Sequence, residues 1–162
     1  KKYSSCSKGC NACCRMVVAT TAVEADLIRL YVEKNLDCAR KEKINRIINE
    51  QKQFYPYVNP LGMLSWKEEI TTFGERNLFC PFLEDDGACL IYEVRPFQCR
   101  KYMVFSPPNE CTDPKGESTQ YNPPVELPIL HSLADLSNLV YHNDILKLQF
   151  KHLPGWFVNG FN

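Results

Sequence analysis

Seven of the nine cysteines lie in two short segments that are separated by about 65 residues. The first segment contributes Cys6, Cys10, Cys13 and Cys14, and the second contributes Cys80, Cys89 and Cys99. Thiolates bind soft and borderline metals tightly, and loops with cysteines a few residues apart can wrap one ion or one iron–sulfur cluster without strain. We therefore predict that the two segments face each other and form a thiolate metal site.

The second cysteine segment contains its own turn signal. Between two apolar pieces it carries the stretch Glu84-Asp85-Asp86-Gly87. Aspartate favours a turn because its side chain hydrogen-bonds the nearby backbone, and glycine does so because it tolerates a positive φ angle. We expect a hairpin-like loop that brings Cys80 and Cys89 to the same end.

A first helix is predicted directly after the N-terminal cysteine segment. Thr21 and Glu24 have the spacing of a capping box, so the helix should begin there and continue to about Asn35. The residues expected to form its apolar face are Val23, Leu27 and Leu30 or Tyr31.

A second helix is predicted from Asp37 to about Tyr55, where Pro56 ends it. The residues expected to point inward are Ile44, Ile47, Ile48 and Phe54. Cys38 stands at the start of this helix, outside both cysteine motifs. We expect it to be a small core residue and not a metal ligand.

A third helix is predicted from Leu127 to about Phe150, because apolar residues recur there at helical spacing and Pro128 stands in the first turn. The fold class is therefore mainly α, with about three principal helices beside an irregular cysteine-rich region. The length of 162 residues predicts a single domain over 1–162 that can bury a core without disulfides.

Two irregular connections complete the chain. Residues 56–79 are rich in proline and glycine, and a strand or two is expected at 63–66 and 70–73. Residues 105–126 form a long proline-rich loop with Cys111 in the middle. Loops of that length are usually functional or held in place by another group.

The net charge excludes two classes of partner. The 19 Lys and Arg residues balance the 19 Asp and Glu residues, so the formal charge is zero and nothing indicates binding to nucleic acid or to a membrane surface. No apolar run approaches the roughly 20 residues that a membrane span requires. We expect a soluble, cytoplasmic protein, although the chain opens without a methionine and a cleaved signal remains compatible with it.

Disulfides and thiol catalysis explain the cysteines less well than metal does. The cysteine count is odd, and a chain of this size does not need disulfides. A nucleophilic cysteine normally needs a histidine base. The three histidines, His131, His142 and His152, lie on or beyond the third predicted helix, where we expect surface residues.

The cysteine pattern resembles that of a known family. It reads Cys6-xxx-Cys10-xx-Cys13-Cys14, then Cys80-Pro81-Phe82-Leu83, Gly87-x-Cys89-x-Ile91-Tyr92 and Arg95-Pro96-xx-Cys99-Arg100. This resembles the bacterial CxxCxxCC cysteine-cluster proteins, which are described as zinc- or iron-chelating. The nickname has two residues between the first two cysteines, whereas this chain has three. The resemblance implies metal ligands among the seven clustered cysteines, with Cys111 as an eighth candidate.

The number of candidate ligands leaves the kind of metal open. One tetrahedral site needs four ligands, so the surplus indicates either a four-iron cluster with spare structural thiols or two zinc-type sites. Side chains alternate along an extended chain, so we expect that Cys13 and Cys14 do not both enter one mononuclear site. We expect Arg95 and Arg100 to donate hydrogen bonds to sulfur, and Tyr92 to pack as a lid.

The same pattern is similar to a segment of the flagellin lysine-N-methylase. That resemblance implies an iron–sulfur cluster, S-adenosylmethionine chemistry and a protein substrate. The chain lacks the glycine-rich strand-to-helix turn that holds nucleotide cofactors, so metal binding is the main hypothesis and a cluster-dependent methylating enzyme is the alternative. The first three cysteines also have the spacing of radical S-adenosylmethionine enzymes, but those enzymes carry it in a barrel of repeated strand–helix units, which this chain lacks.

Overall fold

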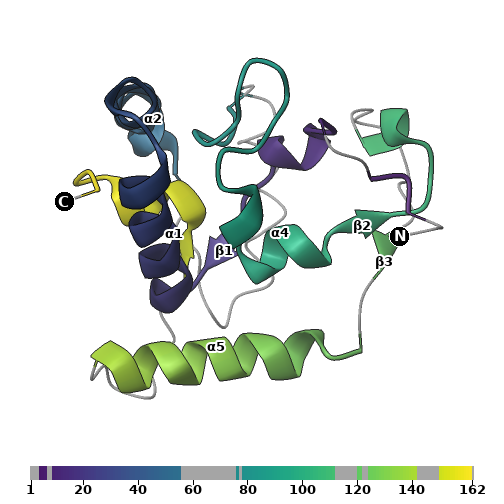
Figure 1. The fold of residues 1–162 in the computed structure, drawn as a ribbon. Coiled ribbons are helices and arrows are strands. Elements are labelled where there is room, and N and C mark those ends of the chain that lie inside the picture. The colour runs from purple at the N-terminus through teal and green to yellow at the C-terminus, as the bar shows by residue number, and fades with distance from the viewer. Residues whose placement is uncertain are drawn as a thin grey trace.

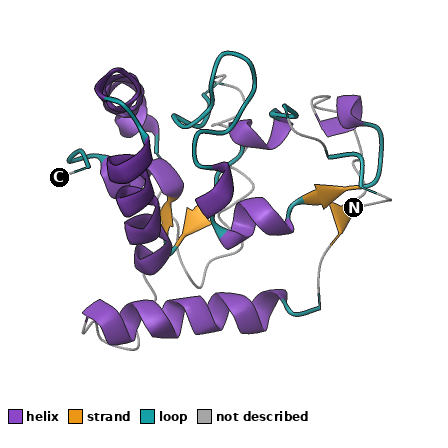
Figure 2. Ribbon diagram, viewed as in Figure 1, coloured by secondary structure: helices purple, strands orange, loops and turns teal. Residues whose placement is uncertain are grey.

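The computed structural model describes residues 4–6, 9–55, 76, 78–111, 120–121, 124–141 and 150–161. Helices dominate these residues (Figures 1 and 2). The α-helices are α1 (Ala22–Asn35), α2 (Cys38–Gln51), α4 (Phe97–Lys101) and α5 (Glu126–Tyr141). The 3₁₀ helices are η1 (Ala12–Arg15), η2 (Lys52–Phe54), η3 (Tyr92–Val94), η4 (Pro108–Cys111) and η5 (Leu153–Phe157). The predicted class, mainly α with three principal helices, is confirmed.

Two short antiparallel strand pairs join distant parts of the chain. The strands are β1 (Ala19–Thr20), β2 (Met103–Val104), β3 (Gln120–Tyr121) and β4 (Lys151–His152). Strand β1 pairs with β4, with Ala19 opposite His152, and β2 pairs with β3, with Met103 opposite Tyr121. The first pair therefore ties the segment after the N-terminal cysteines to the C-terminal part of the chain.

Helix α1 begins as predicted but buries another face. The capping box is present, and the Thr21 backbone N–H donates to Glu24 Oε2 at 2.9 Å. The residues that the helix buries are Ala25, Ile28 and Val32. Leu27 is 53% exposed and Leu30 is 63% exposed, so these two predictions were wrong, whereas the alternative Tyr31 packs against the hydrophobic core. The buried face is the one that enters the hydrophobic core beside η3 and η5, which local spacing cannot reveal.

Helix α2 is confirmed with one correction at each end. Its N-cap is Asp37, whose Oδ1 accepts from the Arg40 backbone N–H at 2.8 Å. Among its predicted inward residues, those that are buried are Ile44, Ile47 and Ile48. Phe54 is 37% exposed because α2 has ended at Gln51 and the chain has turned into η2. Cys38 is exposed, so the prediction that it lies in the core was wrong.

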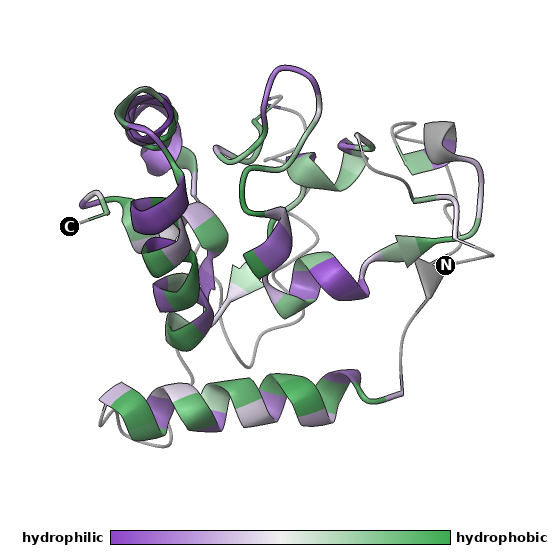
Figure 3. Cartoon of the chain, in the orientation of Figure 1, coloured by the Kyte–Doolittle hydropathy of each residue, from purple (hydrophilic) through white to green (hydrophobic). Residues whose placement is uncertain are grey.

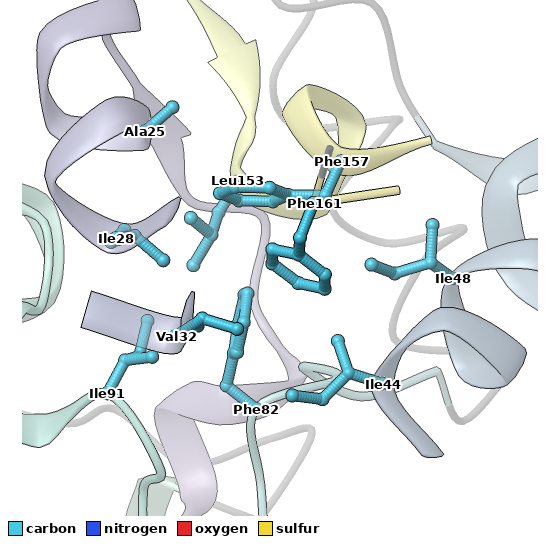
Figure 4. Close-up of a cluster of buried hydrophobic side chains, with 10 residues drawn as sticks. All are labelled: Ala25, Ile28, Val32, Ile44, Ile48, Phe82, Ile91, Leu153, Phe157 and Phe161. Atoms are coloured by element: carbon cyan, nitrogen blue, oxygen red, sulfur yellow. The ribbon is translucent and has the colours of Figure 1, made fainter. Parts of the chain in front are cut away.

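The main hydrophobic core lies between α1, α2, η5 and the second cysteine segment (Figure 4). It consists of Ala25, Ile28, Val32, Ile44, Ile48, Phe82, Ile91, Leu153, Phe157 and Phe161. Phe82 is fully buried, and its ring contacts that of Phe157 edge to face with centroids 5.7 Å apart. The second cysteine segment is therefore anchored in the core by its own aromatic and aliphatic side chains.

Helix α5 runs past one side of the molecule (Figure 1) and turns small and polar residues toward it. Its buried residues are Ala134, Ser137 and Asn138. Ser137 Oγ accepts from the Val23 backbone N–H at 3.2 Å, which satisfies a donor that the first turn of α1 leaves without an intrahelical partner. Leu136 and Leu139 are exposed, and Figure 3 shows such hydrophobic stretches along α5.

Three predictions fall on residues outside the described ranges. They are the strands at 63–66 and 70–73 and the last turns of the third predicted helix, at 142–149. Among the helices that the structure describes, none has both the length and the apolar character that crossing a membrane would demand.

His152 is buried beside β1, so the expectation of a surface histidine was wrong for this residue. Its Nδ1 accepts a hydrogen bond of 3.1 Å from the Val18 backbone N–H. Its ring meets that of Tyr55 edge to face, with centroids 5.3 Å apart. His131 is exposed on α5, as expected.

Acid is expected to destabilise the protein through His152. Burial lowers the pKa of this side chain to about 4, from its usual value of 6.5. Above pH 6.5 the His152 side chain is neutral in both the folded and the unfolded chain. As the pH falls toward 4, His152 binds a proton in the unfolded chain but not in the folded one. The free energy of unfolding should therefore fall by about 3 kcal/mol between pH 7 and pH 4 through this group.

Denaturant unfolding at these two pH values tests the assignment. In His152→Asn, an amide oxygen can still accept from Val18 but cannot titrate, so the acid-dependent loss should be smaller by about 3 kcal/mol. His131→Asn is the matched control and should lose as much as the wild type. An equal loss in the wild type and His152→Asn would contradict the prediction.

Candidate metal centre

The second cysteine segment folds as the hairpin-like loop that its turn signal predicts. Leu83 and Cys89 form an antiparallel bridge, and the Leu90 backbone N–H donates to the carbonyl oxygen of Phe82 at 2.9 Å. The turn itself passes through Gly87, at a φ angle of +81°. Cys80 and Cys89 both pack against the main core, so they lie at the same, anchored end of the loop.

The N-terminal segment presents Cys13 and Cys14 from a helical turn and not from an extended chain. Both residues lie in η1, and the Met16 backbone N–H closes the turn on the carbonyl oxygen of Cys13 at 3.1 Å. Their side chains hydrogen-bond each other. The expectation that these two thiols point in opposite directions was therefore wrong, because it assumed extended backbone.

A backbone hydrogen bond joins the two cysteine segments. The Cys80 N–H donates to the carbonyl oxygen of Cys14 at 2.7 Å. The hairpin turn touches the same segment, because a Cβ placed on Gly87 would lie 2.8 Å from the carbonyl oxygen of Gly9 and 3.4 Å from Asn11 Nδ2. The two segments are therefore neighbours in space, as the sequence predicts.

The inner thiol group consists of the five cysteines that influence one another across this junction: Cys13, Cys14, Cys80, Cys89 and Cys99. Burial raises the pKa of Cys80 to about 12, and the charges of Cys89 and Cys13 add to the effect. Burial also raises the pKa of Cys99 well above its usual value, followed by the charges of Cys80, Cys13 and Cys89. One protein environment therefore holds thiols from both segments.

Cys13 is the thiol of this group that ionises most readily. The hydrogen bond from the Cys14 side chain lowers the pKa of Cys13 to about 7, and the positive charge of Arg95 contributes in the same direction. The same hydrogen bond raises the pKa of Cys14 strongly. A thiolate, not a thiol, is the form that binds metal, and within this group Cys13 reaches that form at the lowest pH.

The outer thiol group consists of Cys6, Cys10 and Cys111. The Val104 backbone N–H donates to Cys6 Sγ at 3.4 Å, and the Ser5 N–H donates to the carbonyl oxygen of Val104 at 2.9 Å, which holds this part of the chain along β2. Burial raises the pKa of Cys111, and the charges of Cys10, Cys6 and the inner-group Cys13 raise it further. Since η4, which carries Cys111, contacts η1, the two groups adjoin.

The arginines beside the second segment act differently from each other. The Arg95 guanidinium lies over the Tyr92 ring at 3.7 Å from its centroid, and its charge lowers the pKa of Cys13 and opposes the rise at Cys89. Arg100 donates through Nε to the carbonyl oxygen of Arg95 at 2.7 Å and through Nη2 to that of Glu93. Arg95 thus supplies charge to the thiols, whereas Arg100 supports the backbone between η3 and α4.

Among the described residues, no three Cys, His, Asp or Glu side chains are arranged so that they could hold a metal ion as they stand. The donor chemistry nevertheless fits zinc or an iron–sulfur cluster, because the inner thiol group offers sulfur from both segments, one member with a lowered pKa, and a neighbouring positive charge. Carboxylates, which calcium and magnesium prefer, are not part of this set.

Sequence reasoning missed two contacts that shape this centre. One is the approach of Gly87 to Gly9, and the other is a hydrogen bond of 2.8 Å from the Phe97 backbone N–H to Glu24 Oε1. Both join residues more than seventy positions apart, so no local pattern could reveal them. The turn from Glu84 to Gly87 was the part that the turn signal did predict.

The Gly87→Ala variant is expected to loosen the junction of the two segments. A side chain at this positive φ angle is strained, and its Cβ would overlap the carbonyl oxygen of Gly9. We expect the free energy of unfolding to fall by about 2–4 kcal/mol. Gly9→Ala is the control, because Gly9 has a φ angle of +89° with open space around it, and it should cost only about 1 kcal/mol. Equal losses of unfolding free energy in Gly87→Ala and Gly9→Ala, measured by urea titration, would show that the contact between Gly87 and Gly9 contributes nothing to stability.

Comparison with known families agrees with the cysteine pattern. The model of the CxxCxxCC family, described as "Putative zinc- or iron-chelating domain", matches residues 5–123, which is well over half of the chain and includes both cysteine segments. The resemblance stated from the motifs is thereby confirmed. No curated protein and no solved structure matches the chain significantly.

Proposed function

Because the chain belongs to the CxxCxxCC family, we propose that it is a metal-binding domain whose two cysteine segments hold zinc or an iron–sulfur cluster in one shared thiolate site. The observation that carries this proposal is the hydrogen bond of 2.7 Å between the Cys80 N–H and the carbonyl oxygen of Cys14. It places the start of the second segment directly against η1, where Cys13 and Cys14 lie.

The shared site is formed by the inner thiol group. Cys80 and Cys89 are held by the core, Cys99 by α4, and Cys13 and Cys14 by η1. Since no three of the described side chains are arranged for coordination as they stand, binding requires the thiols to draw together as their protons leave. Arg95 favours that change, because its charge stabilises the thiolate form.

The sulfur donors and the family description together favour zinc or iron as the metal. Four thiolates around one zinc ion leave a local charge of minus two, which Arg95 partly offsets. Five inner thiols also exceed what one tetrahedral ion needs, and this surplus equally suits a four-iron cluster with one structural thiol. The bound group would supply a stable cross-link between the segments, and an iron–sulfur cluster would add electron transfer.

Elemental analysis of protein purified without oxygen tests the proposal. A zinc site predicts zinc without visible absorption, whereas a cluster predicts iron, acid-labile sulfide and broad absorption at about 400 nm. The cysteine variant Cys80→Ser should lose the metal, because Cys80 lies at the junction. Folded wild-type protein that contains neither zinc nor iron would contradict the proposed function.

A further inference from the structure

Glu24 joins two helices that are far apart in the sequence. Its Oε2 accepts from the Thr21 backbone N–H at 2.9 Å and from Thr21 Oγ1 at 2.8 Å, which closes the capping box of α1. Its Oε1 accepts from the Phe97 backbone N–H at 2.8 Å. One carboxylate therefore serves the first turn of α1 with one oxygen and the first turn of α4 with the other.

Helix α4 depends on a hydrogen-bond acceptor from another part of the chain. It has only five residues, and a helix this short has little stability of its own. Its N-cap, Pro96, has no side-chain hydrogen-bond acceptor, so the free N–H groups of the first turn must be satisfied from elsewhere. The Glu24 carboxylate accepts a hydrogen bond from the Phe97 backbone N–H. It also adds a negative charge at the N-terminus of the helix, where the helix dipole favours one.

Helix α4 carries Cys99, two residues after the N–H that Glu24 holds. Cys99 is a member of the inner thiol group and lies in the field of Cys80, Cys13 and Cys89. Helix α1, in contrast, is anchored in the main core through Ile28 and Val32. The bond from Glu24 to Phe97 is therefore a direct link between the helix that is anchored in the main core and the helix that carries Cys99.

We propose that Glu24 is a positioning residue for the metal site: its carboxylate attaches α4 to the capped end of α1 and thereby sets the place of Cys99 among the other thiols. This inference rests on the proposed function, because it assigns a task to Glu24 only if Cys99 binds the metal. Glu24 does not contact the thiols in this role, and its effect passes through the backbone of α4.

Two matched variants separate this role from ordinary helix capping. Glu24→Ala removes the cap interaction and the link to Phe97 together. Thr21→Ala weakens the same cap but leaves Oε1 of Glu24 free to hold α4. Glu24→Gln keeps one side-chain oxygen, which can accept from Thr21 or from Phe97 but serves both less well. All three changes weaken the cap at the first turn of α1, so all three carry the cost in stability that comes from a weaker cap.

The measurement is the rate at which excess EDTA removes the resident metal, followed by elemental analysis at set times. Glu24→Ala should lose metal about tenfold faster than the wild type, which is the scale of change expected when a support of a ligand is removed. Thr21→Ala should stay within about twofold of the wild type and Glu24→Gln should fall between them. Hydrogen exchange at the Phe97 amide should accelerate in Glu24→Ala and not in Thr21→Ala.

Three results would overturn the inference, and each of them differs from failure of the proposed function. Equal rates of metal loss in Glu24→Ala and Thr21→Ala would show that Glu24 acts only as a helix cap. An unchanged Phe97 amide in Glu24→Ala would show that the link does not hold α4. If instead Cys99→Ser keeps the full wild-type metal content, then Cys99 is the structural thiol of the inner thiol group, and the task assigned to Glu24 fails while the shared site stands.

Discussion

Replacing Phe82 with alanine is expected to lower the free energy of unfolding by about 4 kcal/mol. The side chain is fully buried, and its ring meets those of Phe157 and Phe161 with centroids 5.7 and 6.3 Å away. Truncation would remove this burial and leave a cavity in the middle of the core (Figure 4). Because Phe82 follows Cys80 by two positions, the same change should free the hairpin loop and weaken metal retention.

Urea unfolding of the wild type and two variants measures this effect. Phe79→Ala is the matched control, since Phe79 lies on the other side of Cys80 and is 36% exposed, and it should cost less than about 1 kcal/mol. A loss in Phe82→Ala no larger than that in Phe79→Ala would mean that the second cysteine segment is not anchored in the core.

The start signals of the helices and the buried face of α2 could be predicted from the sequence, whereas the buried face of α1 could not. The capping box of Thr21 and Glu24 and the inward isoleucines of α2 depend on neighbours within one or two turns. The exposed Leu27 and Leu30 show the limit of such reasoning, because α1 has more than one apolar stripe. Packing against η3 and η5 selects the stripe that carries Ile28, and those contacts are not local.

The candidate site was predictable as a set of cysteines but not as an arrangement. The turn before Gly87 predicted the hairpin, and the hairpin predicted that Cys80 and Cys89 lie together. Nothing local predicted that Cys13 and Cys14 share a helical turn, since η1 lacks the length that produces a periodic pattern. The division into an inner and an outer thiol group depends on contacts of η1 with η4 and with Cys80, which only the folded chain contains.

The largest effect is expected from losing either half of the shared site. Cys13→Ser and Cys89→Ser each remove one thiol of the inner group, one from each segment. If one metal site joins both segments, its binding free energy is also folding free energy, which for structural zinc is on the order of 10 kcal/mol. Each variant should therefore lose the same metal and become much more sensitive to protease over the whole domain.

Metal content per chain in Cys13→Ser, Cys89→Ser and Cys38→Ser is the measurement that tests the shared site most directly. Cys38→Ser is the control, because Cys38 is exposed at the start of α2 and should retain the wild-type content. A single shared site predicts that Cys13→Ser and Cys89→Ser lose the same metal to the same extent and give the same pattern of protease fragments. The single shared site would be contradicted by full wild-type metal content in either Cys13→Ser or Cys89→Ser. It would also be contradicted if the two variants lost different fractions of the metal and gave different protease-resistant fragments.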